Sequence, residues 1–251
     1  MLWTALDITS PGIIACVGAG GKTSLLQSLA VCACRRKLPV LVTTTTRMFS
    51  SQLAGYRLIL TEDYQAGRDA VAAALAAGET AAWLAGREGE KVVGLPDRWL
   101  DKLAAELPSV YMLVEADGAR HSLIKAPAAH EPVIPARTTL TAGVLNLRVL
   151  GQPLSANNAH RPALVAGIIQ KQAGETVSWQ DLARLAVHGQ GIFQHARGAK
   201  VLLLSGGGSS DCQVASAQIA AYCRLAGAAI ERVVVSIGYG HAMQPVTVYT
   251  L

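Results

Sequence analysis

The sequence of 251 residues is poor in several features that mark large classes of protein. Aromatic residues make up only 5% of it and charged residues 16%, whereas hydrophobic residues reach 51%. This composition argues against disorder, and it assigns the packing of the core mainly to aliphatic side chains and glycine. The longest apolar run, residues 70–77, is far shorter than the ~20 residues that span a bilayer. We therefore expect no membrane partner.

Cysteine and clustered charge are also scarce. The five cysteines contain no C-x-x-C spacing, which argues against a zinc site or a disulfide framework. The net charge is +5, but no block of like charge is longer than Arg35–Arg36–Lys37, and no nucleic-acid recognition motif is present. The N-terminus lacks a basic stretch before an apolar core, so no signal peptide is expected. These features predict a cytoplasmic protein without a nucleic-acid partner, whose excess positive charge serves a phosphate site.

Short β-rich runs alternate with Ala- and Leu-rich helical stretches, a pattern typical of βαβ units and a mainly parallel sheet. Strands are expected at residues 13–17, 39–43, 57–60, 109–114, 138–145, 201–204 and 233–237. Helices are expected at residues 23–36, 62–77, 99–107, 162–196 and 214–226. Residues 81–84 and 91–93 fit either short strands or a hairpin.

At ~150 residues per domain, the length allows one large domain or two small ones. Neither a repeat nor a low-complexity linker divides the chain. We therefore predict a single three-layer P-loop NTPase-like α/β domain over residues 1–251, with a helical insertion at about 160–199. The segment 115–137 lacks periodicity and contains three prolines, and loops of this length are often functional.

A glycine-rich turn lies between the first expected strand and the first expected helix. In that position the backbone N–H groups and the helix N-terminus form a cradle for phosphate. The lysine would reach the β- and γ-phosphates and the threonine hydroxyl would bind Mg²⁺. The predicted nucleotide-binding residues are Gly18, Ala19, Gly20, Gly21, Lys22, Thr23 and Ser24.

The spacing of this turn separates it from two better-known motifs. Cys16 occupies the first glycine position of G-x-x-x-x-G-K-[ST], so the turn fits a shortened G-x-x-G-K-T, like that of Mur ligases. Thr23 stands where a dinucleotide fingerprint requires its third glycine. The alternative is an ordinary glycine-rich turn with an exposed lysine. For the phosphate-binding turn we expect Lys22 to lie at the sheet edge and to make little core contact.

Two acidic residues, Glu115 and Asp117, follow the apolar strand at 109–114. This is the form of a Walker B element, whose acid holds magnesium directly or through water. We predict Lys22, Glu115 and Asp117 as catalytic residues, and Thr23, Glu115 and Asp117 as metal ligands. The alternative is that one acid caps the loop and the other is solvated.

Further candidates follow neighbouring strands or lie on the long loop. In a parallel sheet the carboxyl ends of the strands face the ligand crevice, so four threonines in a row there are suggestive, although threonine also simply suits strands. Each loop residue taken alone can be a solvated side chain. The substrate or loop candidates are Thr43, Thr44, Thr45, Thr46, Arg47, Arg120, Lys125, His130, Glu131, His160 and Arg161.

Four runs together resemble the YqeC-type selenium-dependent hydroxylase accessory proteins, over nearly the whole chain. The runs are Val17–Thr23, Thr43–Met48, Val114–Arg120 and Lys125–Pro135, and His160–Arg161–Pro162 is similar to the same family. The resemblance implies a P-loop-like nucleotide-binding protein that is associated with maturation of selenium-dependent molybdenum hydroxylases. It implies as partners a molybdenum hydroxylase or its cofactor-maturation proteins, and it defines no reaction.

One element departs from that family. Its members often carry an Asn-Lys-x-Asp-like element after a late strand, but here the strand at 201–204 continues into Ser205–Gly206–Gly207–Gly208. Guanine selectivity therefore does not follow, and the nucleotide is either ATP or GTP.

These observations support three hypotheses. The first is an Mg²⁺-dependent enzyme or switch that uses a nucleoside triphosphate in hydroxylase maturation. Its catalysis would rest on positioning and charge stabilisation and would need no covalent nucleophile. The second is a small-molecule kinase or ligase in which Lys125, His130 and Arg161 bind an acidic acceptor. The third is a non-hydrolysing scaffold that binds nucleotide to order the 115–137 loop.

Overall fold

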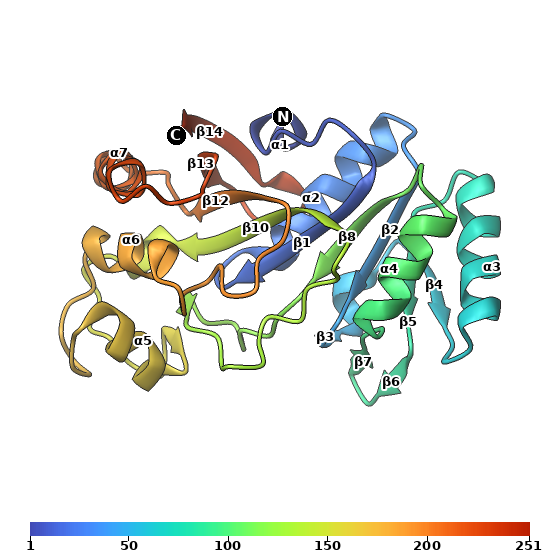
Figure 1. Ribbon diagram of the computed structural model, residues 1–251, viewed down its shortest axis with the longest axis horizontal. Coiled ribbons are helices and arrows are strands. Elements are labelled where there is room, and N and C mark those ends of the chain that lie inside the picture. The colour runs from blue at the N-terminus through green and yellow to red at the C-terminus, as the bar shows by residue number, and fades with distance from the viewer.

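A computed structural model describes residues 1–251, with fourteen strands and seven α-helices (Figure 1). The strands are β1 Gly12–Gly18, β2 Val40–Thr44, β3 Arg47–Phe49, β4 Arg57–Leu60, β5 Ala81–Leu84, β6 Gly86–Glu88, β7 Lys91–Val93, β8 Tyr111–Glu115, β9 Ile124–Lys125, β10 Thr138–Asn146, β11 Ala159–His160, β12 Ala199–Ser205, β13 Arg232–Ile237 and β14 Gln244–Thr250. The helices are α1 Leu2–Ala5, α2 Lys22–Arg35, α3 Tyr64–Ala76, α4 Asp97–Glu106, α5 Pro162–Ile169, α6 Trp179–Val187 and α7 Ser210–Leu225. Short 3₁₀ turns occupy Ser50–Leu53, Leu147–Val149 and Gly240–Ala242.

Nine strands form the central sheet in the order β14-β13-β12-β10-β1-β8-β2-β5-β4. Every neighbouring pair is parallel except β13 and β14, which are antiparallel. The expectation of an α/β chain with a mainly parallel sheet is therefore confirmed. The edge strand β14 was not predicted. Its side chains alternate between exposed and half-buried, so it lacks the continuous apolar run of a buried parallel strand.

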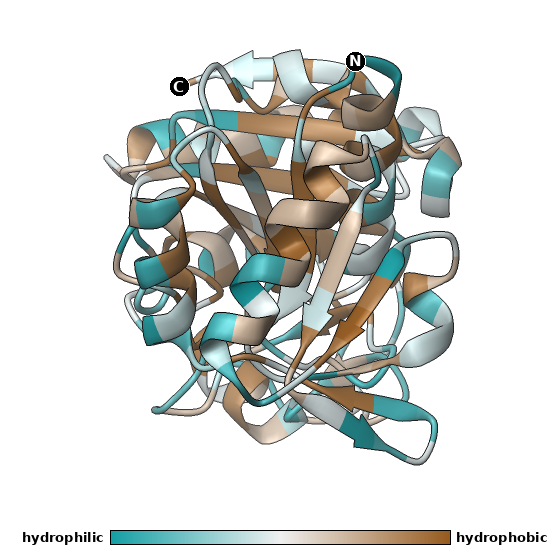
Figure 2. Ribbon diagram, turned by 90° about the vertical axis from the view of Figure 1, so that its right-hand side faces the viewer, coloured by the Kyte–Doolittle hydropathy of each residue, from teal (hydrophilic) through white to brown (hydrophobic).

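Successive residues of the central strands face opposite layers of helices, because side chains alternate along a strand. On β1, Ile14 packs into a core with α1 and α2, whereas Ile13 packs into a core with α3 and α4. A third core lies between β10, β12 and β13 and the helices α5, α6 and α7. Figure 2 shows the resulting distribution, with hydrophobic strands inside and hydrophilic segments on the outer helices.

The expected helix at 162–196 is wrong as a single element. The structure has two short helices there, α5 and α6, which pack against each other at one end of the molecule (Figure 1). The first helix ends because Gln170 adopts a left-handed conformation with φ 57°, and Gly174 follows with φ 88°. The second begins after Ser178, which forms a capping box with Asp181.

The ambiguous segments at 81–84 and 91–93 have different roles. β5 is a parallel strand of the central sheet, whereas β7 pairs with β6 in a hairpin that also binds the short strand β3. This three-stranded sheet lies beyond the carboxyl end of β2. The expected loop 115–137 contains only the two-residue strand β9, which pairs with β11.

The carboxyl ends of β1, β8, β2, β10 and β12 lie side by side because these strands are parallel neighbours. From β1 the chain continues to β2 on one side of the sheet, and from β10 it continues to β12 on the other side; such a switch point is where α/β sheets bind ligands. None of the helices is both long enough and apolar enough to cross a membrane.

Candidate functional site

The loop between β1 and α2 has a backbone that only glycine accommodates at two positions. Gly18 and Gly20 have φ angles of 91° and 78°, and a Cβ on Gly18 would lie 2.2 Å from the carbonyl oxygen of Val144. The carbonyl of Gly20 accepts hydrogen bonds from Asn146 Nδ2 and Ser205 Oγ, both at 2.7 Å. The ends of β10 and β12 therefore hold this turn in place.

Lys22 is the first residue of α2 and is only 4% exposed. Its Nζ donates to the carbonyl of Gly18 at 2.7 Å and lies 3.0 Å from Asp117 Oδ1 and 3.9 Å from Glu115 Oε1. Burial acts to lower the pKa of Lys22, but the two carboxylates outweigh burial and raise that pKa. The expectation that Lys22 makes little core contact is wrong, because the turn folds its ammonium inward onto two acids.

Glu115 ends β8 and faces the start of α2. Thr23 Oγ1 donates to Glu115 Oε2 at 3.1 Å, and Gln52 Nε2 donates to the same threonine oxygen at 3.3 Å. Burial raises the pKa of Glu115, and the charge of Lys22 opposes that rise. Glu115, Thr23 and the half-buried Ser24 all line the cleft described below.

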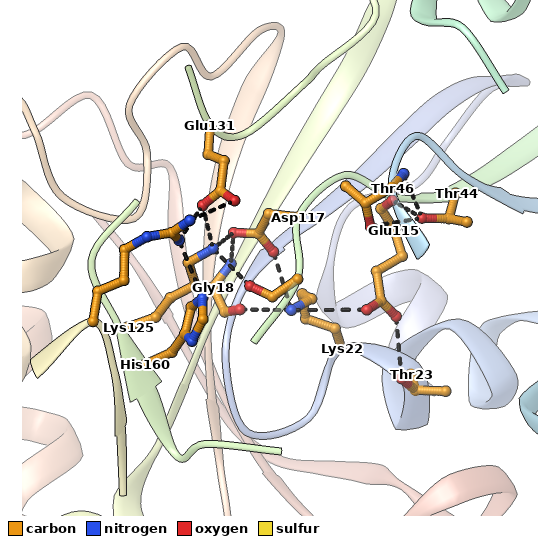
Figure 3. Close-up of polar contacts among 12 residues, drawn as sticks. Gly18, Lys22, Thr23, Thr44, Thr46, Glu115, Asp117, Lys125, Glu131 and His160 are labelled. Carbon is orange, nitrogen blue, oxygen red and sulfur yellow. Dashed lines mark hydrogen bonds and ion pairs between the residues drawn. The ribbon is translucent and has the colours of Figure 1, made fainter. Parts of the chain in front are cut away.

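Asp117 lies deeper than Glu115 and is only 1% exposed. Its Oδ2 accepts a hydrogen bond from the backbone N–H of Gly18 at 3.0 Å and forms an ion pair with Lys125 at 2.9 Å. Its Oδ1 pairs with Lys22. Asp117 thus joins the β1–α2 loop to the long loop, and its oxygens are directed at groups of the protein itself (Figure 3).

The chain of alternating charges continues from Asp117 across the long loop. Lys125 is completely buried, and its Nζ lies 2.8 Å from the carbonyl of Gly118 and 3.1 Å from Glu131 Oε2. Glu131 in turn accepts two hydrogen bonds from the Arg161 guanidinium, at 2.6 and 3.1 Å. We call this set the charge ladder; its members are Lys22, Asp117, Lys125, Glu131 and Arg161, of which the first four are labelled in Figure 3.

Two histidines of the predicted set lie in different surroundings. His160 is half-buried beside Arg161, with its Nε2 3.1 Å from the Arg161 guanidinium. Burial lowers the pKa of His160, and the charges of Lys125, Arg161 and Arg120 lower it further. His130 is exposed and does not line the cleft, so the structure does not bring it to the site.

The four threonines at the end of β2 mainly connect structural elements. The hydroxyls of Thr43, Thr44 and Thr45 donate to carbonyls of β5, β8 and the long loop, at 2.6, 2.7 and 2.8 Å. Thr45 and Thr46 line the cleft, but Thr43 and Thr44 do not. Arg47 also lines it and pairs with an exposed glutamate of β6.

An open cleft of about 920 Å³ lies over these groups. Sequence analysis missed several of its lining residues, which are Gln52, Phe49, Lys91, Asn146, Arg148 and Tyr239. Asn146, like Ser205 beneath the turn, ends a strand of the parallel sheet, so its position at a carboxyl end was a usable signal. The remaining residues come from the small sheet and from turns, where no sequence pattern marked them.

Comparison with known proteins identifies relatives of this chain. A family model described as YqeC protein matches residues 14–163, a segment that begins in β1 and ends just beyond the charge ladder. A relative from Escherichia coli (strain K12), named uncharacterized protein YqeC, is 34% identical over 185 residues, covering 74% of this chain and 71% of the relative. No solved structure matches. The chain belongs to the YqeC family.

Proposed function

We propose that this protein binds a magnesium–nucleoside triphosphate at the turn between β1 and α2, in the manner of a P-loop NTPase. The observation that carries the proposal is the position of Lys22. This lysine opens a helix after a glycine-constrained turn and lies beside two acids at the floor of a large cleft. A strand, a glycine turn, a lysine and a helix in this order form an anion site.

The proposed phosphate site uses groups that the fold already orients. The N–H groups at the start of α2 and the positive end of its dipole would bind phosphate oxygens. The raised pKa keeps Lys22 protonated, and its Nζ already makes one bond to a loop carbonyl. A triphosphate would therefore meet a positive charge that needs only a small movement to reach it.

Magnesium fits the pair of Thr23 and Glu115 better than it fits Asp117. The two oxygens of that pair lie 3.1 Å apart and line the cleft, whereas Asp117 is enclosed by Lys22, Lys125 and the Gly18 amide. No group of three or more His, Cys, Asp or Glu side chains is arranged to hold a metal, so phosphate and water would supply the other ligands. When bound, magnesium would neutralise charge on the β- and γ-phosphates.

Phosphoryl transfer is the reaction class that this site supports best, because it requires positioning and charge stabilisation rather than a protein nucleophile. The nearest thiol, Cys16, is fully buried, and burial raises its pKa strongly. A kinase or ligase acting on an anionic acceptor is a second candidate. Several cations of the cleft that have no acidic partner favour this second candidate. The resemblance to hydroxylase accessory proteins supports a setting in molybdenum hydroxylase maturation.

The test is calorimetric titration with ATP and GTP, with and without Mg²⁺. Lys22→Ala should weaken triphosphate binding by about 1.5–3 kcal/mol, the usual contribution of a charge-assisted contact. Because Lys22 is buried against Asp117, that variant also leaves a buried carboxylate with one cation fewer. The double variant Lys22→Ala/Asp117→Asn removes this charge and separates a folding defect from lost binding.

The metal is tested by turnover against Mg²⁺ concentration. Glu115→Gln should abolish the metal-dependent rate and spare metal-free nucleotide binding, since an amide holds Mg²⁺ poorly. Arg148→Gln is the matched control, because Arg148 lines the cleft without contacting the proposed metal pair. Wild-type nucleotide affinity in a folded Lys22→Ala variant would refute the phosphate site, and an unchanged metal dependence in Glu115→Gln would refute the metal site.

A further inference from the structure

Three cations that line the cleft have no carboxylate within ion-pair distance. They are Lys91, Arg120 and Arg148. By contrast, the charges of Lys125 and Arg161 are already balanced by Asp117 and Glu131. The unbalanced positive charge of the cleft therefore lies at Lys91, Arg120 and Arg148. It does not lie at the residues that the sequence predicted to bind an acidic acceptor.

The three cations divide into two groups on opposite sides of the phosphate turn. Arg148 follows β10 and donates to the hydroxyl of Tyr239, which follows β13, at 2.8 Å. Lys91 is on β7, in the small sheet beyond β2, and Arg120 follows β8. In the central sheet β10 and β8 are the two neighbours of β1. One triphosphate anchored on α2 extends towards one of these groups and leaves the other free.

The group beyond β8 also contains an aromatic surface. The rings of Phe49 and His121 are stacked with their centroids 5.6 Å apart and an angle of 23° between them. Lys91 Nζ lies over the Phe49 ring, 5.2 Å from its centroid. We call Phe49, Lys91, Arg120 and His121 the cation flank.

The backbone of the cation flank is strained at two consecutive residues. Arg120 and His121 both adopt left-handed conformations, with φ angles of 46° and 63°. Non-glycine residues in this region cost energy, and they cluster at sites where the surrounding structure fixes a functional geometry. In this conformation the His121 ring lies against Phe49 of the small sheet.

The position of the proposed metal pair decides which side faces the reacting phosphate. Magnesium held by Thr23 and Glu115 would neutralise charge on the terminal phosphates, so this pair would mark the terminal end of the triphosphate. Glu115 ends β8, the strand that leads into Arg120 and His121. The terminal phosphate would therefore face the cation flank, and the base would lie towards Arg148.

We propose that the cation flank is the subsite for a second substrate, an anionic molecule that carries a planar aromatic ring. The ligand ring stacks on the exposed ring of His121, which Phe49 supports from its other face, and the anionic group is bound by Lys91 and Arg120. This inference rests on the proposed triphosphate site, because that site defines where the reacting phosphate lies. It also replaces Lys125, His130 and Arg161 as the groups that bind the acceptor.

The test uses flavin mononucleotide as a fluorescent probe that combines a planar ring with a phosphate. The protein is first saturated with Mg²⁺ and a non-hydrolysable ATP analogue, so that the phosphate turn is occupied. Stacking of the flavin then quenches its fluorescence. We expect binding, and we expect riboflavin, which lacks the phosphate, to bind at least about tenfold more weakly.

Variants assign the binding to named residues. Phe49→Leu and the double variant Lys91→Gln/Arg120→Gln should each weaken flavin mononucleotide binding at least about tenfold and leave the affinity for the ATP analogue within about twofold. Arg98→Gln is the matched control, because it removes an exposed cation outside the cleft that forms no ion pair, and it should leave flavin binding unchanged.

Absence of flavin mononucleotide binding to the analogue-loaded protein would overturn the subsite. So would competition between the two ligands, or a loss of analogue affinity in Phe49→Leu, since either result means that the flank holds the nucleotide's own base. Failure of the analogue to bind the wild type overturns the proposed triphosphate site instead. In that case flavin mononucleotide is titrated into the protein without the analogue, and the same variants test whether it binds at the cation flank.

Discussion

The charge ladder and the cation flank border the same cleft but treat positive charge in opposite ways. In the ladder every cation contacts a carboxylate, and Lys125 is completely buried between two of them. In the flank Lys91 and Arg120 are exposed and have no acidic partner. A buried charge must be paired because desolvation is costly, whereas an exposed charge remains hydrated without one.

This difference separates two functions of basic residues. Within the ladder the charges neutralise one another and connect the phosphate turn, the long loop and the start of α5, and only Lys22 is also proposed to bind a ligand. The flank keeps its charges available for a ligand. Basic residues that are close together in the sequence can therefore belong either to the ladder or to the flank, and only their burial in the structure distinguishes the two.

The largest effect should follow removal of the central cation of the ladder. Lys125→Met keeps the length of the side chain but leaves both Asp117 and Glu131 with one cation fewer. Breaking a buried ion pair costs ~3–5 kcal/mol, and we expect the lower end of that range because each acid keeps one partner. The measurement is the free energy of unfolding in urea at neutral pH.

Arg120→Gln is the control for this variant, since it removes an exposed cation of the flank without breaking an ion pair. It should change the free energy of unfolding by less than ~0.5 kcal/mol. Similar losses in the two variants would contradict the distinction between ladder and flank.

The second effect is a pH dependence that belongs to the ladder. Burial acts to raise the pKa of Glu131, but the hydrogen bonds from Arg161 and the charge of Lys125 outweigh it and lower that pKa from 4.5 to about 2. A carboxyl whose pKa is depressed by folding contributes stability above its unfolded pKa, and loses that contribution as the pH falls through its folded pKa. The stability that Glu131 provides should therefore be complete near neutral pH and disappear between about pH 4.5 and pH 2.

The measurement compares wild type with Glu131→Gln by urea unfolding across that range. The difference in free energy of unfolding should be largest at neutral pH and shrink as the pH falls. Glu88→Gln, which removes the exposed partner of Arg47, should show a small difference throughout. A difference between wild type and Glu131→Gln that stays constant with pH would mean that the charge of Glu131 contributes nothing to stability.

The sequence predicted much of the fold because the relevant signals are local. The alternation of apolar runs and helical stretches gave the parallel sheet, and the glycine turn before Lys22 gave the start of α2. The break between α5 and α6 depends on the left-handed conformation of Gln170. Glutamine has no preference for this conformation, so the break could not be predicted from the residue type. The edge strand β14 has the alternation of a half-exposed strand rather than a buried apolar run.

The site was predictable in its parts but not in its contacts. Strand ends pointed to Glu115 and Asp117, but which acid faces Thr23 depends on how the long loop returns to the sheet. Lys125 is buried because the long loop folds over it. The residues next to Lys125 in the sequence give no sign of that burial. Phe49 and Lys91 come together only through pairing between β3 and β7, a short contact without a distinctive pattern.

The smallest effect should come from Arg47, which lines the same cleft and also has an acidic partner. Its Nε lies 2.9 Å from Glu88 Oε2, but the two side chains are 60% and 56% exposed. Exposed pairs contribute ~0.2–1 kcal/mol because water screens them and two flexible side chains lose freedom. Arg47→Gln should therefore lower the free energy of unfolding by no more than this, and 1 M salt, with its Debye length of ~3 Å, should remove most of the difference. The ladder variant Lys125→Met should keep most of its loss in the same salt, because its charges lie outside the reach of mobile ions. A loss in Arg47→Gln that is large and insensitive to salt would show that pairing, rather than burial, determines which charges stabilise this protein.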